Sequence, residues 1–151
     1  MAMKIISHPS PNFGPRKDGK TPRHLILHYT DTKTGADALK IMCDPERQVS
    51  AHYMADDNGD IYQLVDESMR AWHAGQSYWE GESDINSTSI GVEIQNPGHS
   101  FGYQPFPDVQ ISAVIELCKA ICARHDIKPW HVLAHSDIAS DRKQDPGHLF
   151  P

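Results

Sequence analysis

Four polar residues stand at or near the ends of strand-like segments of this sequence, and their types could support hydrolysis. His28 ends an apolar run, His135 follows another, Glu93 lies within a strictly alternating segment, and Asp145 follows in a loop. Two histidines and a carboxylate form the kind of ligand set that binds catalytic zinc and leaves a fourth position open for water. We therefore ask whether the chain can bring His28, His135 and Asp145 to one metal ion.

Zinc in such a site would supply what amide hydrolysis at neutral pH lacks. It lowers the pKa of bound water to about 7 and polarises a carbonyl group. Glu93 is then the candidate general base, and Lys143 is the candidate cation that stabilises the developing oxyanion. These residues are dispersed and no HExxH motif is present, so spacing alone does not separate a metal site from ordinary polar groups at strand ends.

Periodicity indicates the elements that must position these residues. The alternation of Ile90, Val92 and Ile94 directs Glu93 away from the apolar core. Strands are expected over residues 23–30, 50–55, 61–65, 89–95 and 132–134, and helices over residues 34–42 and 108–125. Asn58-Gly59, between the second and third of these strands, predicts an antiparallel hairpin. Strands mixed with helices in this order predict an α/β (α+β) fold, with a mixed central β-sheet flanked by helices.

Two irregular segments complete the expected fold. Residues 1–22 contain many prolines and glycines and are expected to form an ordered arm or loop ahead of the first strand. Residues 66–88 show no sustained hydrophobic periodicity. They include Trp72, His73 and Trp79, and such large side chains argue against a disordered segment. Long irregular segments in compact domains are usually functional, so this one is expected to line a groove.

Length and charge limit the domain organisation and the partners. The 151 residues suffice for one domain, residues 1–151, with no second domain. A net charge of -6 and the absence of a dense Lys/Arg cluster argue against nucleic acid as a partner. No segment is apolar enough to suggest a membrane span or a signal peptide, which predicts cytoplasmic synthesis. A phage-encoded protein or delivery to the cell wall by another route stays open, and a monomer is the default.

Several segments together resemble a known family. They are HLILHYT (residues 24–30), VSAHY (49–53), DIYQLV (60–65), RAWHAG (70–75), NSTSIGVE (86–93), HSDIA (135–139) and RKQDPG (142–147). In this order they are similar to the type-2 N-acetylmuramoyl-L-alanine amidases. These are AmpD-like zinc amidases related to phage lysozyme-type amidases and peptidoglycan recognition proteins. The likeness runs from about residue 7 to residue 147.

The resemblance implies a reaction and a set of residue roles. The reaction is hydrolysis of the amide between the lactyl group of N-acetylmuramic acid and the L-alanine of the peptidoglycan stem peptide, in cell-wall recycling or degradation. One zinc ion would be held by His28, His135 and Asp145, with Glu93 as general base and Lys143 at the oxyanion. Ala51 stands where some members carry a catalytic tyrosine, which favours Glu93 in that role.

Other residues in the same segments are weaker candidates. His52 is expected to be a structural or second-shell histidine. Contacts with the sugar or peptide are expected from Trp72, His73, Trp79 and Asn86, although His73 and Asn86 could instead hold their own loop.

Two other functions remain compatible with the sequence. One is a non-catalytic peptidoglycan-binding module, and the other is a zinc hydrolase acting on a different amide. The sequence leaves open whether the substrate is a soluble anhydro-muropeptide or intact murein. Bacterial and phage origins stay equally possible, as does a longer natural chain.

Overall fold

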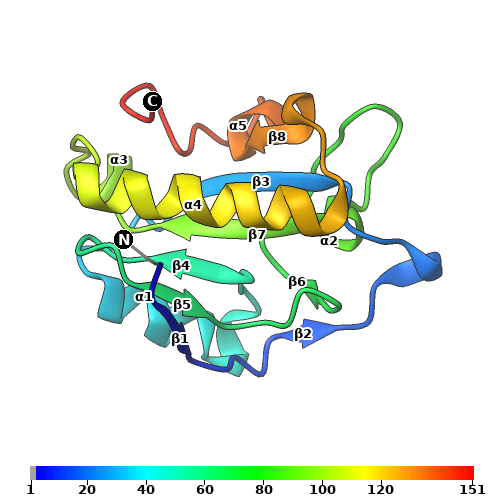
Figure 1. The fold of residues 1–151 in the computed structure, drawn as a ribbon, viewed down its shortest axis with the longest axis horizontal. Coiled ribbons are helices and arrows are strands. Elements are labelled where there is room, and N and C mark those ends of the chain that lie inside the picture. Colours follow the sequence, from blue (N-terminus) through cyan, green and yellow to red (C-terminus); the bar gives the residue numbers. More distant parts are fainter. Residues whose placement is uncertain (1–2) are drawn as a thin grey trace.

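The computed structural model describes residues 3–151 as one α/β unit (Figure 1). Its strands are β1 (Ile5–Ser7), β2 (Phe13–Gly14), β3 (His24–Tyr29), β4 (Tyr53–Ala55), β5 (Ile61–Gln63), β6 (Arg70–Ala71), β7 (Ser89–Ile94) and β8 (Val132–Ala134). Its α-helices are α1 (Gly35–Met42), α2 (Ile85–Thr88), α3 (Gly98–Phe101), α4 (Asp108–His125) and α5 (His135–Ile138), and short 3₁₀ turns cover Lys17–Gly19, Pro45–Arg47 and Pro129–His131.

The central sheet is mixed, as the sequence predicts. It has six strands in the order β1-β5-β4-β7-β3-β8, and a separate two-stranded sheet joins β2 to β6. β4 and β5 form the antiparallel pair expected around Asn58-Gly59, although both strands are shorter than predicted. β3 lies between β7 and β8 and runs parallel to both. The carboxyl ends of these three strands therefore lie side by side at the same end of the sheet.

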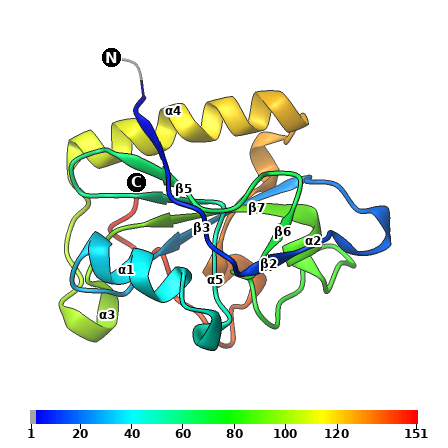
Figure 2. The ribbon, with the colours of Figure 1, turned by 90° about the horizontal axis from the view of Figure 1, so that it is seen from below.

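Helix α4 covers one face of the sheet (Figures 1 and 2). It spans the predicted residues 108–125 and buries Val114, Leu117 and Ile121. These side chains share a core with alternate residues of the strands, among them Leu25, Leu27, Ile90, Val92 and Ile94. The period-2 pattern of β3 and β7 therefore directs one set of side chains into the apolar core beneath α4.

The opposite face of the sheet is covered by shorter helices. Figure 2 shows α4 on one side of the sheet and α1 and α5 on the other. Helix α1 begins after Thr34, whose hydroxyl accepts a hydrogen bond from the backbone N–H of Asp37, as expected for a helix cap. Its buried Leu39 and Met42 pack in a second apolar cluster with Met54 of β4. On this face, Ile26 of β3 packs with Ile138 of α5 in a third apolar cluster.

The N-terminal segment contains two short strands. The expectation of an ordered arm or loop over residues 1–22, ahead of the first strand, is corrected, because β1 pairs with β5 at the edge of the sheet and β2 pairs with β6. Residues 1 and 2 lie outside the described part. A short edge strand with exposed Ile5 carries no burial pattern that sequence periodicity could detect. The side chain of Asn12 fastens the segment to the chain after α1 by hydrogen bonds to the carbonyl oxygens of Asp44 and Val49.

Within residues 3–151, no helix combines the length and apolar character needed to cross a bilayer.

Candidate functional site

His28 and Glu93 are brought together by the register of two parallel strands. In the β3–β7 pair, His28 lies directly opposite Glu93. Their neighbours Leu27 and Val92 are in the core beneath α4, so alternation places both polar side chains on the other face. The predicted orientation of Glu93, away from the core, is confirmed.

His135 and Asp145, from the C-terminal part of the chain, lie at the carboxyl ends of the same strands. β8 pairs with β3 up to Ala134, and the next residue, His135, opens helix α5. Asp145 comes from the loop after α5, and its carbonyl oxygen accepts a hydrogen bond from the backbone N–H of Ser136 at 3.1 Å. That bond closes the loop back on the start of α5, so a residue remote from any strand is held beside the two histidines.

The three side chains form a compact ligand cluster. The Nδ1 atoms of His28 and His135 lie 2.9 Å apart. The Oδ2 atom of Asp145 lies 3.3 Å from the first and 3.2 Å from the second. Tetrahedral zinc with bonds of about 2.0–2.1 Å would separate its ligand atoms by about 3.3 Å. All three residues are buried, and together they form a possible metal site.

Burial and hydrogen bonding set the charge of this cluster. Burial lowers the pKa of His28 to about 4, so the imidazole is neutral and has a lone pair to offer. Burial alone would raise the pKa of Asp145, but hydrogen bonds with His135 and His28 hold it below its usual range. The Nε2 atom of His135 lies 2.9 Å from the carbonyl oxygen of Ala74, which can only accept. In the neutral imidazole this contact leaves the lone pair on Nδ1, which points into the cluster.

Glu93 lies at the edge of this cluster without being part of it. Its Oε1 atom is 4.0 Å from Nδ1 of His28. Its Oε2 atom is buried and has no hydrogen-bond partner among the described residues. Burial, followed by the negative charge of Asp145, raises the pKa of Glu93 well above its usual value. A buried oxygen without a partner usually bonds to water or an ion. A metal ion at the three ligand atoms, with a water molecule between it and Glu93, would satisfy this oxygen.

A pocket of about 310 Å³ opens onto the cluster. Its lining includes Glu93 and Lys143, the two candidate catalytic residues, together with all three candidate ligands. The exposed Lys143 is held by a backbone hydrogen bond of 2.8 Å from its N–H to the carbonyl oxygen of Ala139. The pocket also includes residues to which the sequence assigned no role in the site, namely Tyr29, Thr30, Asp31, Val49, His99, Ser100, Arg142 and Gln144.

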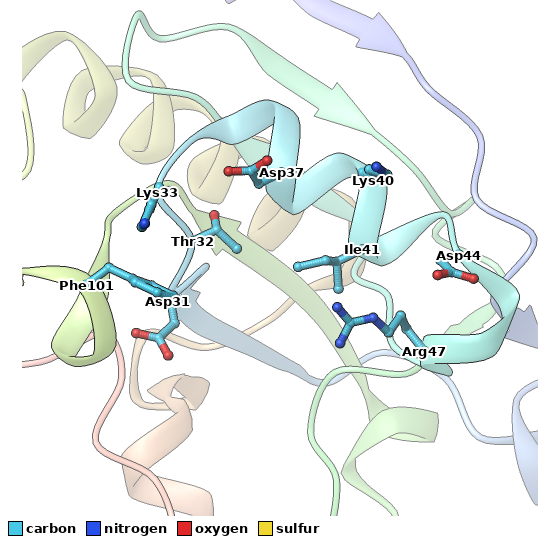
Figure 3. A pocket seen from close by; sticks show the side chains of 9 residues that line it. All are labelled: Asp31, Thr32, Lys33, Asp37, Lys40, Ile41, Asp44, Arg47 and Phe101. Carbon is cyan, nitrogen blue, oxygen red and sulfur yellow. The ribbon is translucent and has the colours of Figure 1, made fainter.

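A second hollow, of about 410 Å³, lies beside α1 and shares Asp31 with the first (Figure 3). Figure 3 shows Lys33 and Phe101 on one side of it and Arg47 on another. The ammonium group of Lys33 lies 5.3 Å from the centre of the Phe101 ring. Acidic and basic side chains both line this hollow, so it carries no single sign of charge.

The residues expected to contact substrate have other contacts in the structure. Asn86 is turned toward the chain itself, because its Oδ1 atom accepts hydrogen bonds from the backbone N–H groups of His73 and Ala74. Trp79 is partly buried against an apolar cluster that includes Ile85. Trp72, Trp79 and Asn86 do not line the pocket at the cluster. Their contact with substrate stays a prediction that these positions do not support.

His73 and His52 form successive layers next to His28. His73 lines the pocket, yet it is buried, and its Nδ1 atom lies 2.9 Å from Nε2 of His28. His52 is fully buried and bonds to the carbonyl oxygen of Met69 and the backbone N–H of Gly91. Its ring centre is 6.0 Å from that of His73, so His52 reaches the cluster only through His73. Of the two roles expected for His52, structural or second-shell, its backbone hydrogen bonds favour the structural one.

Arg142 has a defined structural contact that the sequence did not reveal. Its guanidinium donates hydrogen bonds to the carbonyl oxygens of Ala74 and Gln76. The loop that carries Lys143 and Asp145 is therefore tied to the loop that carries His73. Carbonyl acceptors leave no trace in a sequence, because every residue has one.

Comparison with known proteins agrees with this geometry. The N-acetylmuramoyl-L-alanine amidase family (Amidase_2) matches residues 18–148. The chain is 46% identical over 139 residues to the N-acetylmuramoyl-L-alanine amidase AmiD of Escherichia coli (strain K12), a match that covers 84% of this chain and 49% of AmiD. It thus spans about half the length of that relative. It is also 31% identical to the 1,6-anhydro-N-acetylmuramyl-L-alanine amidase AmpD of the same organism, with 94% of this chain and 85% of AmpD covered.

Solved structures show the same likeness. A crystal structure of an AmpD derivative matches with a TM-score of 0.86 at 27% identity and covers 100% of this chain and 91% of that one. A complex of E. coli AmiD with anhydro-N-acetylmuramic acid-L-Ala-D-gamma-Glu-L-Lys matches with a TM-score of 0.78 at 43% identity, covering 89% of this chain and 56% of that chain. On the family match, these relatives and the shared fold, the chain belongs to the N-acetylmuramoyl-L-alanine amidase family.

Proposed function

We propose that this chain is a zinc-dependent amidase that cleaves the bond between the lactyl group of N-acetylmuramic acid and L-alanine in peptidoglycan fragments. One observation carries the proposal. Nδ1 of His28, Nδ1 of His135 and Oδ2 of Asp145 converge at separations of 2.9–3.3 Å. Electron-pair donors packed this closely repel one another unless a metal ion or a proton lies between them. Zinc suits two imidazoles and one carboxylate that leave a fourth position open.

Zinc, when bound, supplies Lewis-acid chemistry by polarising a carbonyl group and lowering the pKa of water. The chain's own residues supply the proton transfers. Glu93 is placed to take a proton from the attacking water at its unpaired Oε2 atom and to pass it to the departing amine of L-alanine. For this step Glu93 must be ionised, so its raised pKa has to be offset by positive charge in the cluster.

Lys143 completes the set and also lines the pocket. Its exposed ammonium group lies on the loop that also carries Asp145. A cation there stabilises the negative charge that develops on the carbonyl oxygen as water attacks. A pure binding module would need neither an unpaired carboxylate nor a cation beside a ligand cluster, which favours the enzyme over that alternative.

Structures of relatives support a proposal about the substrate class. The AmiD structure contains an anhydro-muramyl tripeptide, and an AmpDh3 structure from Pseudomonas aeruginosa contains an anhydromuramic pentapeptide. We propose soluble anhydro-muropeptides as substrates of this chain. Intact murein is the alternative substrate. The cytoplasmic location and the monomeric state stay predictions.

Metal analysis combined with a cleavage assay tests the proposal. The protein is loaded with zinc, its metal content is measured, and it is incubated with purified anhydro-muropeptides and, separately, with intact murein. We expect one zinc ion per chain and release of free stem peptide, which a chelator and Glu93→Gln both abolish. Stoichiometric zinc without cleavage of any murein fragment would reject the amidase. Cleavage of murein alone would reject only the proposed substrate class.

A further inference from the structure

Two consecutive residues, His73 and Ala74, contact both histidines of the cluster. The imidazole of His73 meets Nε2 of His28 at 2.9 Å, and the carbonyl oxygen of Ala74 meets Nε2 of His135 at 2.9 Å. Each contact lies on the ring nitrogen opposite the one that faces the cluster. Both histidines are thus held from behind by two consecutive residues, one through its side chain and the other through its backbone carbonyl.

Asn86 fixes the backbone of these two residues. Its Oδ1 atom accepts from the N–H of His73 at 3.1 Å and from the N–H of Ala74 at 2.9 Å. Asn86 lies in α2, whose carbonyl oxygens at Asn86 and Ser87 accept hydrogen bonds from Arg16 of the N-terminal arm. A single side-chain amide therefore anchors the supports of two ligands, a more specific role than the loop-holding one that the sequence left open.

The ring of His73 is fixed on its other sides as well. Its Nε2 atom lies 3.0 Å from the hydroxyl oxygen of Ser89, which is fully buried. The ring packs against the backbone of Gly91, where an added Cβ would lie 2.5 Å from Cγ of His73. Any side chain at position 91 would therefore displace the imidazole.

We propose that His73 and Asn86 are positioning residues that set the metal affinity of the cluster. In this arrangement Nε2–H of His28 donates to Nδ1 of His73, and Nε2–H of His73 donates to the hydroxyl of Ser89. His28 and His135 are then both locked in the form that turns an unprotonated Nδ1 toward the metal. The inference rests on the proposed function for its metal, but metal binding can be measured without any substrate.

The direction of these hydrogen bonds can be observed in the unaltered protein. Long-range ¹⁵N–¹H spectra of the zinc-loaded chain distinguish protonated from unprotonated ring nitrogens. We expect protonated Nε2 and unprotonated Nδ1 on His28, His73 and His135. A proton on Nδ1 of His73 would reverse the chain of donors and overturn the proposal, whether or not the protein cleaves muropeptides.

Substitution of His73 tests the effect on affinity. His73→Leu removes the acceptor while keeping much of the volume, and zinc affinity, measured by competition with a chelating dye, should fall roughly ten- to hundredfold. His73→Asn, whose amide can accept near the position of Nδ1, should recover most of the loss. A zinc affinity for His73→Leu within about twofold of the parent, with unchanged circular dichroism, would contradict the proposal.

A matched control separates positioning from simple loss of a buried histidine. His24 lies on the same strand as His28 and is equally buried, but its Nδ1 atom bonds to the hydroxyl of Thr88 and touches no candidate ligand. His24→Leu should leave zinc affinity within about twofold of the parent. If His24→Leu and His73→Leu weaken zinc equally, the effect is general destabilisation and the proposal fails.

Asn86 provides a second, independent variant and addresses substrate contact directly. Asn86→Ala should weaken zinc binding in the same direction as His73→Leu, with little change in KM once the enzyme is saturated with zinc. A raised KM at unchanged zinc affinity would instead show that Asn86 contacts the substrate, as the sequence first suggested. That outcome would reject the positioning role even if amidase activity is fully confirmed.

Discussion

The two faces of the strand pair β3–β7 differ in what they contribute to the molecule. On one face, Leu25, Leu27 and Val92 pack beneath α4 without a polar atom among their side chains. On the other, the buried His28 lies beside the half-buried Glu93, next to polar groups. The same alternation of side chains produces both faces. Apolar burial on the first stabilises the fold, so the second can hold polar groups whose burial costs free energy.

This comparison makes stability and chemistry separable by mutation. Changes on the cluster face should affect metal binding or turnover and leave the fold intact. Changes on the α4 face should do the reverse. The predictions below test that separation, beginning with the largest effect.

Removal of a ligand should abolish function while the fold survives. His28→Ala should lose stoichiometric zinc and reduce amidase activity by at least roughly 10⁴-fold, because the reaction loses its Lewis acid. Metal analysis and the muropeptide assay measure both effects, and circular dichroism checks the fold. Unfolding of this variant would show that the cluster face also carries the stability of the sheet.

Removal of the candidate general base should separate turnover from metal binding. Glu93→Gln keeps the shape of the side chain but cannot accept a proton, so kcat should fall by roughly 10²–10⁴-fold. Zinc content and KM should stay near those of the parent. A variant with unchanged kcat would assign the base to another residue.

A cavity beneath α4 should affect stability alone. Leu117 is fully buried in the core under α4. Leu117→Ala should lower the free energy of unfolding by about 2–5 kcal/mol, as measured by urea denaturation. Zinc affinity and kcat, measured well below the unfolding midpoint, should remain unchanged. Reduced zinc affinity in the folded variant would mean that the two faces are coupled.

The smallest predicted effect concerns the polar edge of the α4 face. Burial raises the pKa of Glu67, but hydrogen bonds from Arg124, Tyr53 and His125 outweigh it and lower the pKa from 4.5 to about 2. Because the folded-state pKa is lowered, this stabilisation is present above about pH 4.5 and is lost as the pH falls toward 2.

Glu67→Gln should therefore lower the free energy of unfolding at pH 7 by up to about 3 kcal/mol, discounted because Arg124 is half-exposed. The difference from the parent should shrink steadily between about pH 5 and pH 2. A difference that is independent of pH would mean that the carboxylate charge contributes nothing.

Much of the candidate site could be anticipated because it depends on local patterns. Alternation in residues 89–95 predicts correctly that Glu93 faces away from the core, and the apolar run before His28 predicts a buried strand. The resemblance to known amidases then groups His28, His135 and Asp145, which the structure brings together. The mixed sheet, the hairpin and both long helices are confirmed as well.

The features that the sequence did not reveal share a physical cause. Edge strand β1 was missed because its pairing with β5 depends on backbone hydrogen bonds, and none of its three side chains is buried. Substrate contact by Asn86 and His73 stays a prediction. The partners that the structure gives these two residues are backbone groups, Ser89 and His28, which lie next to them only after the chain has folded.

The sequence by itself determined the alternation that builds the apolar core under α4 and the residue types that can bind a metal. These depend on composition and on neighbours along the chain. Only the tertiary structure decided that Nδ1, rather than Nε2, of each histidine faces Asp145, and that Ala74 and His73 hold the rings from behind. Such choices are made by backbone carbonyls and by side chains distant in sequence, which become neighbours only when the parallel strands are in register.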